Sequence, residues 1–159
     1  MKKVIIALVL ILSVFIVGGI YIYQSANASY AQAEQETVAF LKERTDLKDV
    51  DEFYWYNSEA TIFTVKGSNE SAEEKYYLVK PDGGTVIMFD AADMVTEQEA
   101  RRKTNEARSP KRILNAKIGL MEETPIWEVT YKNEHDRLGY YIIDLKTGEW
   151  IRAVDNILF

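Results

Sequence analysis

Two different hydrophobic patterns divide the chain. From Val4 to Tyr23, twenty consecutive residues carry no charge, and Ser13 is the one conventional polar side chain among them. After residue 28, apolar residues instead recur at helical spacing or in short runs bounded by glycine, proline and charged residues. The pattern therefore predicts an apolar N-terminal helix followed by a folded region of helices and strands.

The apolar segment has the length of a membrane span. At 1.5 Å per residue a helix of this length reaches about 30 Å, the thickness of a bilayer core. Lys2 and Lys3 precede it and no basic residue follows until Lys42, which indicates a cytoplasmic N-terminus. We expect residues 1–3 to be a cytoplasmic tail, 4–23 a single-pass signal anchor in the cell membrane and 24–28 a linker, with the C-terminal region extracytoplasmic.

A cleaved signal peptide is the alternative interpretation of this segment. Ala26-Asn27-Ala28 matches the A-x-A pattern of a cleavage site. Signal-peptide cores usually span about 7 to 15 residues, whereas this one continues through Ile20–Tyr23. The length favours an uncleaved anchor, and cleavage after Ala28 stays an open alternative.

The exported region contains a repeat. Residues 61–87 align without a gap on residues 125–151, at a constant offset of 64, with eight of 27 positions identical. The identical pairs include Ile62/Ile126, Asn69/Asn133 and Gly84/Gly148. Because this period is longer than that of a solenoid repeat, we interpret it as the tandem duplication of a small domain.

Each copy predicts the same order of elements. A helix comes first, two strands follow, and a longer segment interrupted by glycine forms a hairpin of two antiparallel strands. In the second copy, Thr96 and Glu99 form a capping box at the start of the helix, which should end near Ser109-Pro110. The expected elements are a helix over 29–44 and strand segments over 51–57, 61–66 and 75–89, then a helix from 97 and strand segments over 113–121, 126–132 and 139–154.

These elements predict an α+β fold. Each unit has one helix packed on an antiparallel sheet of about four strands, because this arrangement buries the apolar faces of both. We place the first unit at residues 29–90 and the second at 93–159. The second helix offers only small residues such as Ala100 and Ala107, so its packing face is expected to be thin.

Charge and cysteine content narrow the possible partners. The chain carries 19 basic and 25 acidic residues; without Lys2 and Lys3, 17 basic residues remain, and the net charge beyond the apolar segment is −8. An acidic domain repels phosphate backbones, so we expect no nucleic-acid binding and favour a protein partner with a basic surface. With no cysteine, the chain has no disulfide, thiolate metal ligand or cysteine nucleophile.

Few residues suggest catalysis. The one histidine, His135, falls in a polar segment between two predicted strands and is expected to be a solvated turn residue. The carboxylate pairs Asp90 with Asp93 and Glu122 with Glu123 lack the ligand spacing of a calcium loop and are expected to be exposed charges. No sequence motif for a hydrolase, kinase or nucleotide-binding site occurs. We therefore predict no enzymatic activity, no cofactor and no metal.

The aromatic run Phe53–Tyr56 is the most distinctive part of the first unit. Successive strand residues point to opposite faces, so this strand is aromatic on both. One face can meet the helix of its own unit, while the other either packs against the second unit or is exposed as a protein-binding patch. Trp127 aligns with Phe63 and is assigned to the core. The candidate protein-binding residues are Tyr54, Tyr56, Tyr131 and Trp150.

One motif in the second copy carries a family resemblance. The residues Tyr140 to Asp144, followed by Lys146-Thr147-Gly148-Glu149, resemble the Y-x-V-D-x-x-T-G-E signature of PepSY-type domains. The first copy departs from it, with Lys80 in place of the aspartate and Asp82-Gly83-Gly84-Thr85 at the turn. Together with the anchor, the duplication and the length, the whole chain resembles the TseB-like (YpmB-like) cell-wall elongation regulators of Gram-positive bacteria.

That resemblance implies a cystatin-like fold for each unit and a regulatory role. The expected function is control of peptidoglycan synthesis through contact with a membrane-bound penicillin-binding protein. The alternative is a PepSY-type inhibitor or regulator of an extracellular peptidase, in which the sheet or its loops enter a protease groove or pair with an extended peptide. An enzyme such as a wall hydrolase is a third hypothesis. The oligomeric state, the binding face and the direction of regulation stay open.

Overall fold

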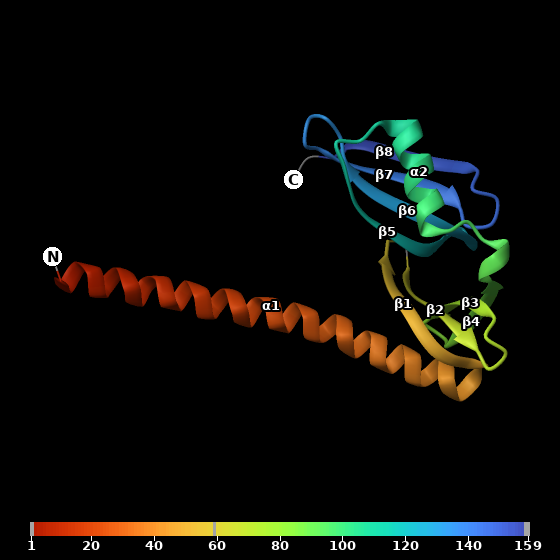
Figure 1. Cartoon of the computed structure of the whole chain (residues 1–159), viewed down its shortest axis with the longest axis horizontal. Helices are drawn as coiled ribbons and strands as arrows, with labels where there is room; N and C mark the ends of the chain where they lie inside the picture. Colours follow the sequence, from red (N-terminus) through yellow and green to blue (C-terminus); the bar gives the residue numbers. More distant parts are fainter. Residues whose placement is uncertain (1, 59, 158–159) are drawn as a thin grey trace. The chain divides into compact units, whose positions relative to one another are not determined.

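The computed structural model describes the backbone of residues 2–58 and 60–157, and the side chains of these residues except 2–11, 17, 20, 21 and 23–27. The chain forms two compact units, Met1–Glu36 and Thr37–Phe159. Its elements are labelled in Figure 1. They are α1 (Lys2–Arg44), β1 (Leu47–Asn57), β2 (Thr61–Asn69), β3 (Glu74–Lys80), β4 (Thr85–Asp90), the 3-10 turn η1 (Ala91–Asp93), α2 (Glu97–Arg108), β5 (Arg112–Met121), β6 (Thr124–Lys132), β7 (Leu138–Asp144) and β8 (Trp150–Ile157).

The first compact unit, Met1–Glu36, consists of most of α1 and differs from the two repeated copies expected from the sequence. The helix continues without a break from Lys2 to Arg44, so the segment 24–28 that was expected as a linker is helical. The membrane span expected over Val4–Tyr23 falls mostly on side chains outside the described set. Among the residues that the structure does describe, no helix is both long enough and apolar enough to cross a bilayer.

The second compact unit, Thr37–Phe159, contains both repeated copies, as two antiparallel sheets with the same winding. The first sheet has the order β1-β2-β3-β4 and the second the order β5-β6-β7-β8. The expected α+β architecture of four strands per copy is confirmed. Four strand ends lie two or more residues beyond the predicted bounds: β1 begins at Leu47, β2 continues to Asn69, β6 begins at Thr124 and β8 continues to Ile157. These extensions contain polar residues that pair through their backbones, which a side-chain pattern does not reveal.

The two copies also agree in strand register. Val65 pairs with Tyr77 in the first sheet, and Val129 pairs with Tyr141 in the second, which is the same match at the offset of 64. Their turns agree as well. The side-chain oxygen of Asn69 accepts the amides of Ser71 and Glu73, as that of Asn133 accepts the amides of His135 and Arg137. These repeated bonds support the duplication.

A glycine occupies the same left-handed position in both hairpins. Gly84 has a φ of 64° and its amide donates to Lys80, while Gly148 has a φ of 67° and its amide donates to Asp144. In the second hairpin a side chain also stabilises the turn, because Asp144 Oδ1 accepts the amides of Lys146 and Thr147. The aspartate of the PepSY-type motif therefore fixes a turn, and Lys80 cannot accept these bonds in the first copy.

The helices contribute unequally to the core. The C-terminal turns of α1 bury Thr37 and Leu41, and the ring of Phe40 lies against Gly84. As expected, α2 buries only small residues, Ala100 and Thr104. A large residue on the sheet compensates: Trp127 is fully buried, and its indole donates to the carbonyl of Val95, just before α2. The assignment of Trp127 to the core is thus confirmed.

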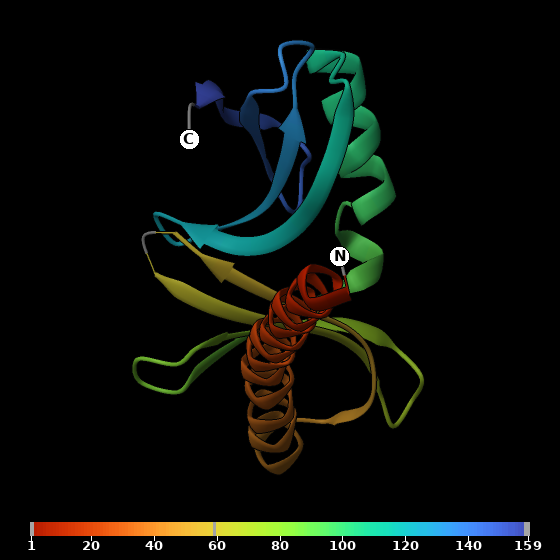
Figure 2. The same ribbon diagram turned by 90° about the vertical axis from the view of Figure 1, so that its left-hand side faces the viewer.

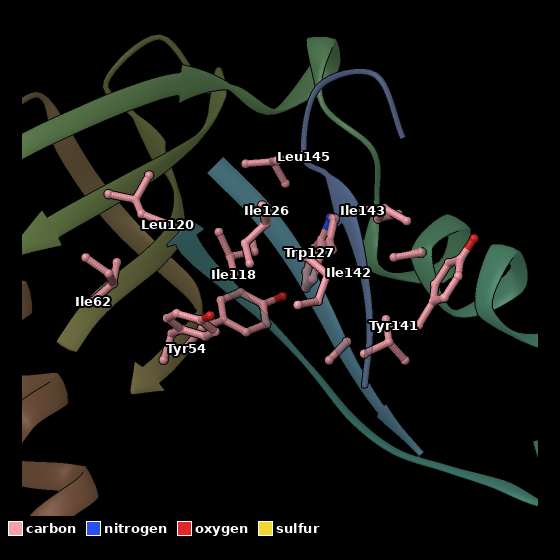
Figure 3. Close-up of a cluster of buried hydrophobic side chains, with 14 of the residues drawn as sticks. Tyr54, Ile62, Ile118, Leu120, Ile126, Trp127, Tyr141, Ile142, Ile143 and Leu145 are labelled. Carbon is pink, nitrogen blue, oxygen red and sulfur yellow. The ribbon is translucent and has the colours of Figure 1, made fainter. Parts of the chain in front are cut away.

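The two sheets share one core where β1 and β5 lie side by side (Figures 1 and 2). Tyr54 meets Trp127 edge to face, with ring centroids 5.5 Å apart (Figure 3). The ring of Tyr56 lies directly over Gly119 of β5, where a Cβ atom would overlap it. One face of the first sheet therefore packs against the second half of the chain, which is the first of the two alternatives that the sequence left open.

The contact between Tyr56 and Gly119 leads to a stability prediction. Gly119→Ala would place a methyl group inside the Tyr56 ring, and we expect it to lower the free energy of unfolding by about 1 to 3 kcal/mol. Urea unfolding followed by tryptophan fluorescence measures the loss. The control is Gly18→Ala, whose Cβ meets nothing within 4 Å. Unchanged stability of Gly119→Ala would contradict the close packing of the sheets.

Candidate functional site

A cleft lined mainly by charged and polar residues lies between the first sheet and α2. Its volume is about 670 Å³. Tyr54 on β1 and Tyr76 on β3 form its floor, because the registers of β1, β2 and β3 place both on the face that meets the second half of the chain. Glu97 and Arg101 of α2 form the opposite wall.

Helix capping determines where this wall stands. Thr96 caps α2, and its hydroxyl accepts the amide of Glu99 at 3.2 Å, so the predicted N-terminus of the helix is confirmed. One turn later the guanidinium of Arg101 donates to Glu97 at 2.6 Å, across an i,i+4 spacing. The start of α2 thus presents an ordered ion pair to the cleft.

The charges of the cleft neutralise one another. Lys66 pairs with Glu74 at 3.4 Å, and the Tyr54 hydroxyl contacts the carboxylates of Glu52 and Glu97. The lining contains three acidic residues, Glu52, Glu74 and Glu97, and three basic residues, Lys66, Arg101 and Arg102. The cleft therefore suits a polar ligand with balanced charge, such as a peptide segment, better than a simple anion or cation.

Burial and neighbouring carboxylates keep the floor tyrosines neutral. Burial, followed by the negative charges of Glu52, Glu74 and Glu97, raises the pKa of Tyr76 to about 12. Burial also raises the pKa of Tyr54, and its contact with Glu52 raises it further. Both hydroxyls therefore stay protonated at neutral pH, and that of Tyr54 donates to Glu52 and Glu97.

The residues that were considered for chemistry lie apart from the cleft. His135 is exposed in the turn between β6 and β7, and Glu122 and Glu123 form the exposed turn between β5 and β6. Asp90 and Asp93 are exposed at the two ends of the segment that leaves β4. Among the described residues, no three His, Cys, Asp or Glu side chains are placed to hold a metal ion.

The four candidate binding residues have different positions. Tyr54, Tyr56 and Tyr131 are 8%, 3% and 1% exposed, whereas Trp150 is 60% exposed. The first three do not form a surface patch, because Tyr54 and Tyr56 fill the core between the sheets and Tyr131 points its hydroxyl to Asp155. Trp150, at the start of β8, is the one of these four with a largely exposed side chain, and its role stays a prediction.

Sequence reasoning missed the contribution of α2 to the cleft. Glu97 and Arg101 carry the i,i+4 spacing of a helical ion pair, but this signal is typical of any solvated helix face. Their position opposite Tyr54 and Tyr76 depends on how the two halves pack. The lateral alignment of Glu52 with Lys66 also required the β1–β2 register, which contains two bulges.

The fold and the cleft define a class: a small α+β module with two sheets of identical winding, joined by a shared core and bordered by a polar, charge-balanced cleft. Comparison with known proteins gives a more particular likeness. Residues 36–80, from the end of α1 to the end of β3, match the family described as the cell wall elongation regulator TseB-like domain.

A solved structure supports the same likeness. The YpmB protein from Bacillus subtilis superposes with a TM-score of 0.68 and 20% sequence identity, over 76% of this chain and 95% of that chain. At this identity the match shows a shared fold. Among curated proteins, no sequence matches this chain. The chain is thus TseB-like over residues 36–80 and YpmB-like in fold, and the expected resemblance to TseB-like (YpmB-like) proteins is confirmed.

The neutral tyrosines of the cleft predict an alkaline instability. A phenol with a pKa near 10 in the unfolded chain and about 12 in the fold favours the folded state below pH 10 and loses that preference as the pH rises towards 12. At pH 11 the loss for Tyr76 is about 1 kcal/mol. Tyr76→Phe removes the ionisable phenol. The unfolding free energy of this variant should therefore fall less between pH 9 and pH 11 than that of the wild type.

Denaturant unfolding of the wild type and of Tyr76→Phe at both pH values measures this difference. Measurements at pH 7, where both states of the wild type hold a neutral phenol, provide the control for any effect of losing the hydroxyl itself. Parallel declines in the two proteins would show that Tyr76 ionises as readily in the fold as in the unfolded chain.

Proposed function

We propose that the chain is a membrane-anchored, extracytoplasmic and non-enzymatic regulator of cell-wall elongation, which acts by binding a penicillin-binding protein. The observation that carries the proposal is the match of residues 36–80 to the TseB-like domain, whose description is that of a cell-wall elongation regulator. The match covers the end of α1 and the three strands that form the floor of the cleft.

Exposed apolar side chains on α1 support the anchor. Leu12, Val14, Phe15, Ile16 and Ile22 are between 53% and 74% exposed. A run of exposed large apolar side chains is costly in water and marks a surface that a membrane or a partner covers. Lys2 and Lys3 before it favour a cytoplasmic N-terminus and an extracytoplasmic second unit.

The site supports binding rather than catalysis. Its charged groups already have partners in salt bridges and hydrogen bonds, and its tyrosines are neutral. A cleft of this kind can recognise the polar groups of a protein segment at little electrostatic cost, because each charge already has a partner. The acidic surplus beyond the anchor favours a partner with a basic surface.

Placing charge on the exposed apolar surface tests the anchor. We expect the full-length wild type to stay in membranes washed with alkaline carbonate, and Leu12→Arg with Phe15→Arg to be released, because each arginine costs roughly 3 kcal/mol in a bilayer core. Fractionation followed by immunoblotting measures this. Leu114→Arg, at an exposed position of β5, is the matched control and should stay bound.

Two results would contradict the anchor. One is wild-type protein that the carbonate wash releases. The other is a mature protein whose mass corresponds to cleavage after Ala28, which would support the alternative of a signal peptide.

Capture from solubilised membranes tests the partner. The tagged full-length chain should enrich a penicillin-binding protein, whereas residues 1–28 fused to an unrelated folded domain should not. Mass spectrometry of the captured proteins measures both. If the folded chain captures no wall-synthesis protein, the proposal fails; if it captures and slows an extracellular peptidase, the peptidase-regulator alternative takes its place.

A further inference from the structure

The four edge strands of the two sheets differ in how well they are protected. β1 and β5 lie against each other, and each contains at least one irregularity in register. β8 has two register shifts, a residue with positive φ at Asn156 and exposed charges at Arg152 and Asp155. Bulges, charges and coverage are the usual means by which proteins prevent strand addition at an edge.

β4 has none of these protections. It pairs with β3 over six consecutive residues without a register shift, and β3 is its one strand partner among the described residues. Its sequence, Thr-Val-Ile-Met-Phe-Asp, contains no proline and carries no charge before Asp90. Met88 in the middle of the strand is 52% exposed. The outer edge therefore offers regular backbone donors and acceptors beside apolar side chains.

The end of β4 adjoins an acidic depression. It has a volume of about 870 Å³ and is lined by Glu73, Glu74, Asp90 and Asp93 together with Lys75. Lys75 is already bound to Asp46 at 2.8 Å, and Glu74 is paired with Lys66. Asp90 and Asp93 have no ion-pair partner among the described residues. A basic group is thus the complementary occupant of this depression.

We propose that β4 binds an extended segment of a partner protein as a fifth, antiparallel strand of the first sheet, with a Lys or Arg at the N-terminal end of that segment beside Asp90 and Asp93. Antiparallel pairing follows the pattern of the sheet and places the start of the added strand next to the end of β4. The proposal rests on the chain being a protein-binding module and holds for any partner that supplies such a segment.

A pair of synthetic peptides tests the geometry. The first is acetyl-Lys-Lys-Thr-Val-Thr-Val-Thr-Val-amide, and the second has the same composition with the two lysines at the C-terminal end. Binding to the full-length chain in detergent micelles is measured by fluorescence anisotropy. We expect the first peptide to bind about tenfold more tightly, since one well-placed charge contact is worth that factor. N-methylation of every second residue should abolish binding, because it removes the strand hydrogen bonds.

Two variants locate the site. Met88→Lys adds a protective charge in the middle of the edge and should weaken the first peptide about tenfold, whereas Leu114→Lys on β5 should leave it unchanged. Asp90→Asn, at an exposed position, should remove the preference for the first peptide over the second without loss of folding. Circular dichroism confirms that each variant is folded.

Three outcomes would overturn the proposal: equal binding of the two peptides, binding that survives N-methylation, or a wild-type chain that dimerises through β4 and excludes the peptide. The last result would make a second copy of this chain the occupant. The peptides are not taken from any cell-wall protein, so their failure to bind would leave the proposed function standing. Failure to capture a penicillin-binding protein would in turn leave the strand-addition site standing.

Discussion

The packing of β1 against β5 is the contact on which the rest of the second unit depends. A single helix can cover only one face of a four-stranded sheet. Without a second layer, the other face of the first sheet would expose Tyr54, Tyr56 and Ile62. The second half of the chain covers this face, because Gly119 lets the ring of Tyr56 lie directly on the β5 backbone. The same contact brings α2 opposite Tyr76 and so creates the polar cleft.

The duplicated halves are alike in their turns and unlike in their helices. Asn69 and Asn133 organise the same loop, and Gly84 and Gly148 the same hairpin, because these turns depend on backbone geometry that few residues can satisfy. The helices face different sheets and have diverged: Phe40 and Leu41 supply bulk in the first copy, while Trp127 supplies it from the sheet in the second.

Binding capacity is unevenly distributed over the surface. The groups of the cleft are largely engaged with one another, so a ligand there replaces existing bonds rather than adding new ones. The outer edge of β4 is different, since its backbone groups have no strand partner on that side among the described residues. Recognition through an edge depends on backbone pairing and tolerates variation in the partner's side chains, with the acidic depression supplying orientation.

The sequence by itself determined the order and type of the strands and of α2, the duplication, the cap at Thr96 and the two glycine turns. Each of these depends on residues close together in the chain or on a repeat visible in the letters. It did not determine which aromatic residues would be exposed. Tyr54, Tyr56 and Trp150 follow similar strand patterns, yet two are buried and one is not, because burial depends on what lies across from the strand.

Only the tertiary structure decided how the halves meet. Two contacts join residues distant in sequence: Gly119 lies under Tyr56, and the Tyr54 hydroxyl bonds to Glu97. The unpaired edge of β4 likewise depends on the strand order of the whole sheet. The alternation of apolar and polar residues predicts which residues share a face of a strand. It predicts neither what packs against each face nor which strand lies at the edge of the sheet. The cleft and the edge are properties of that assembly.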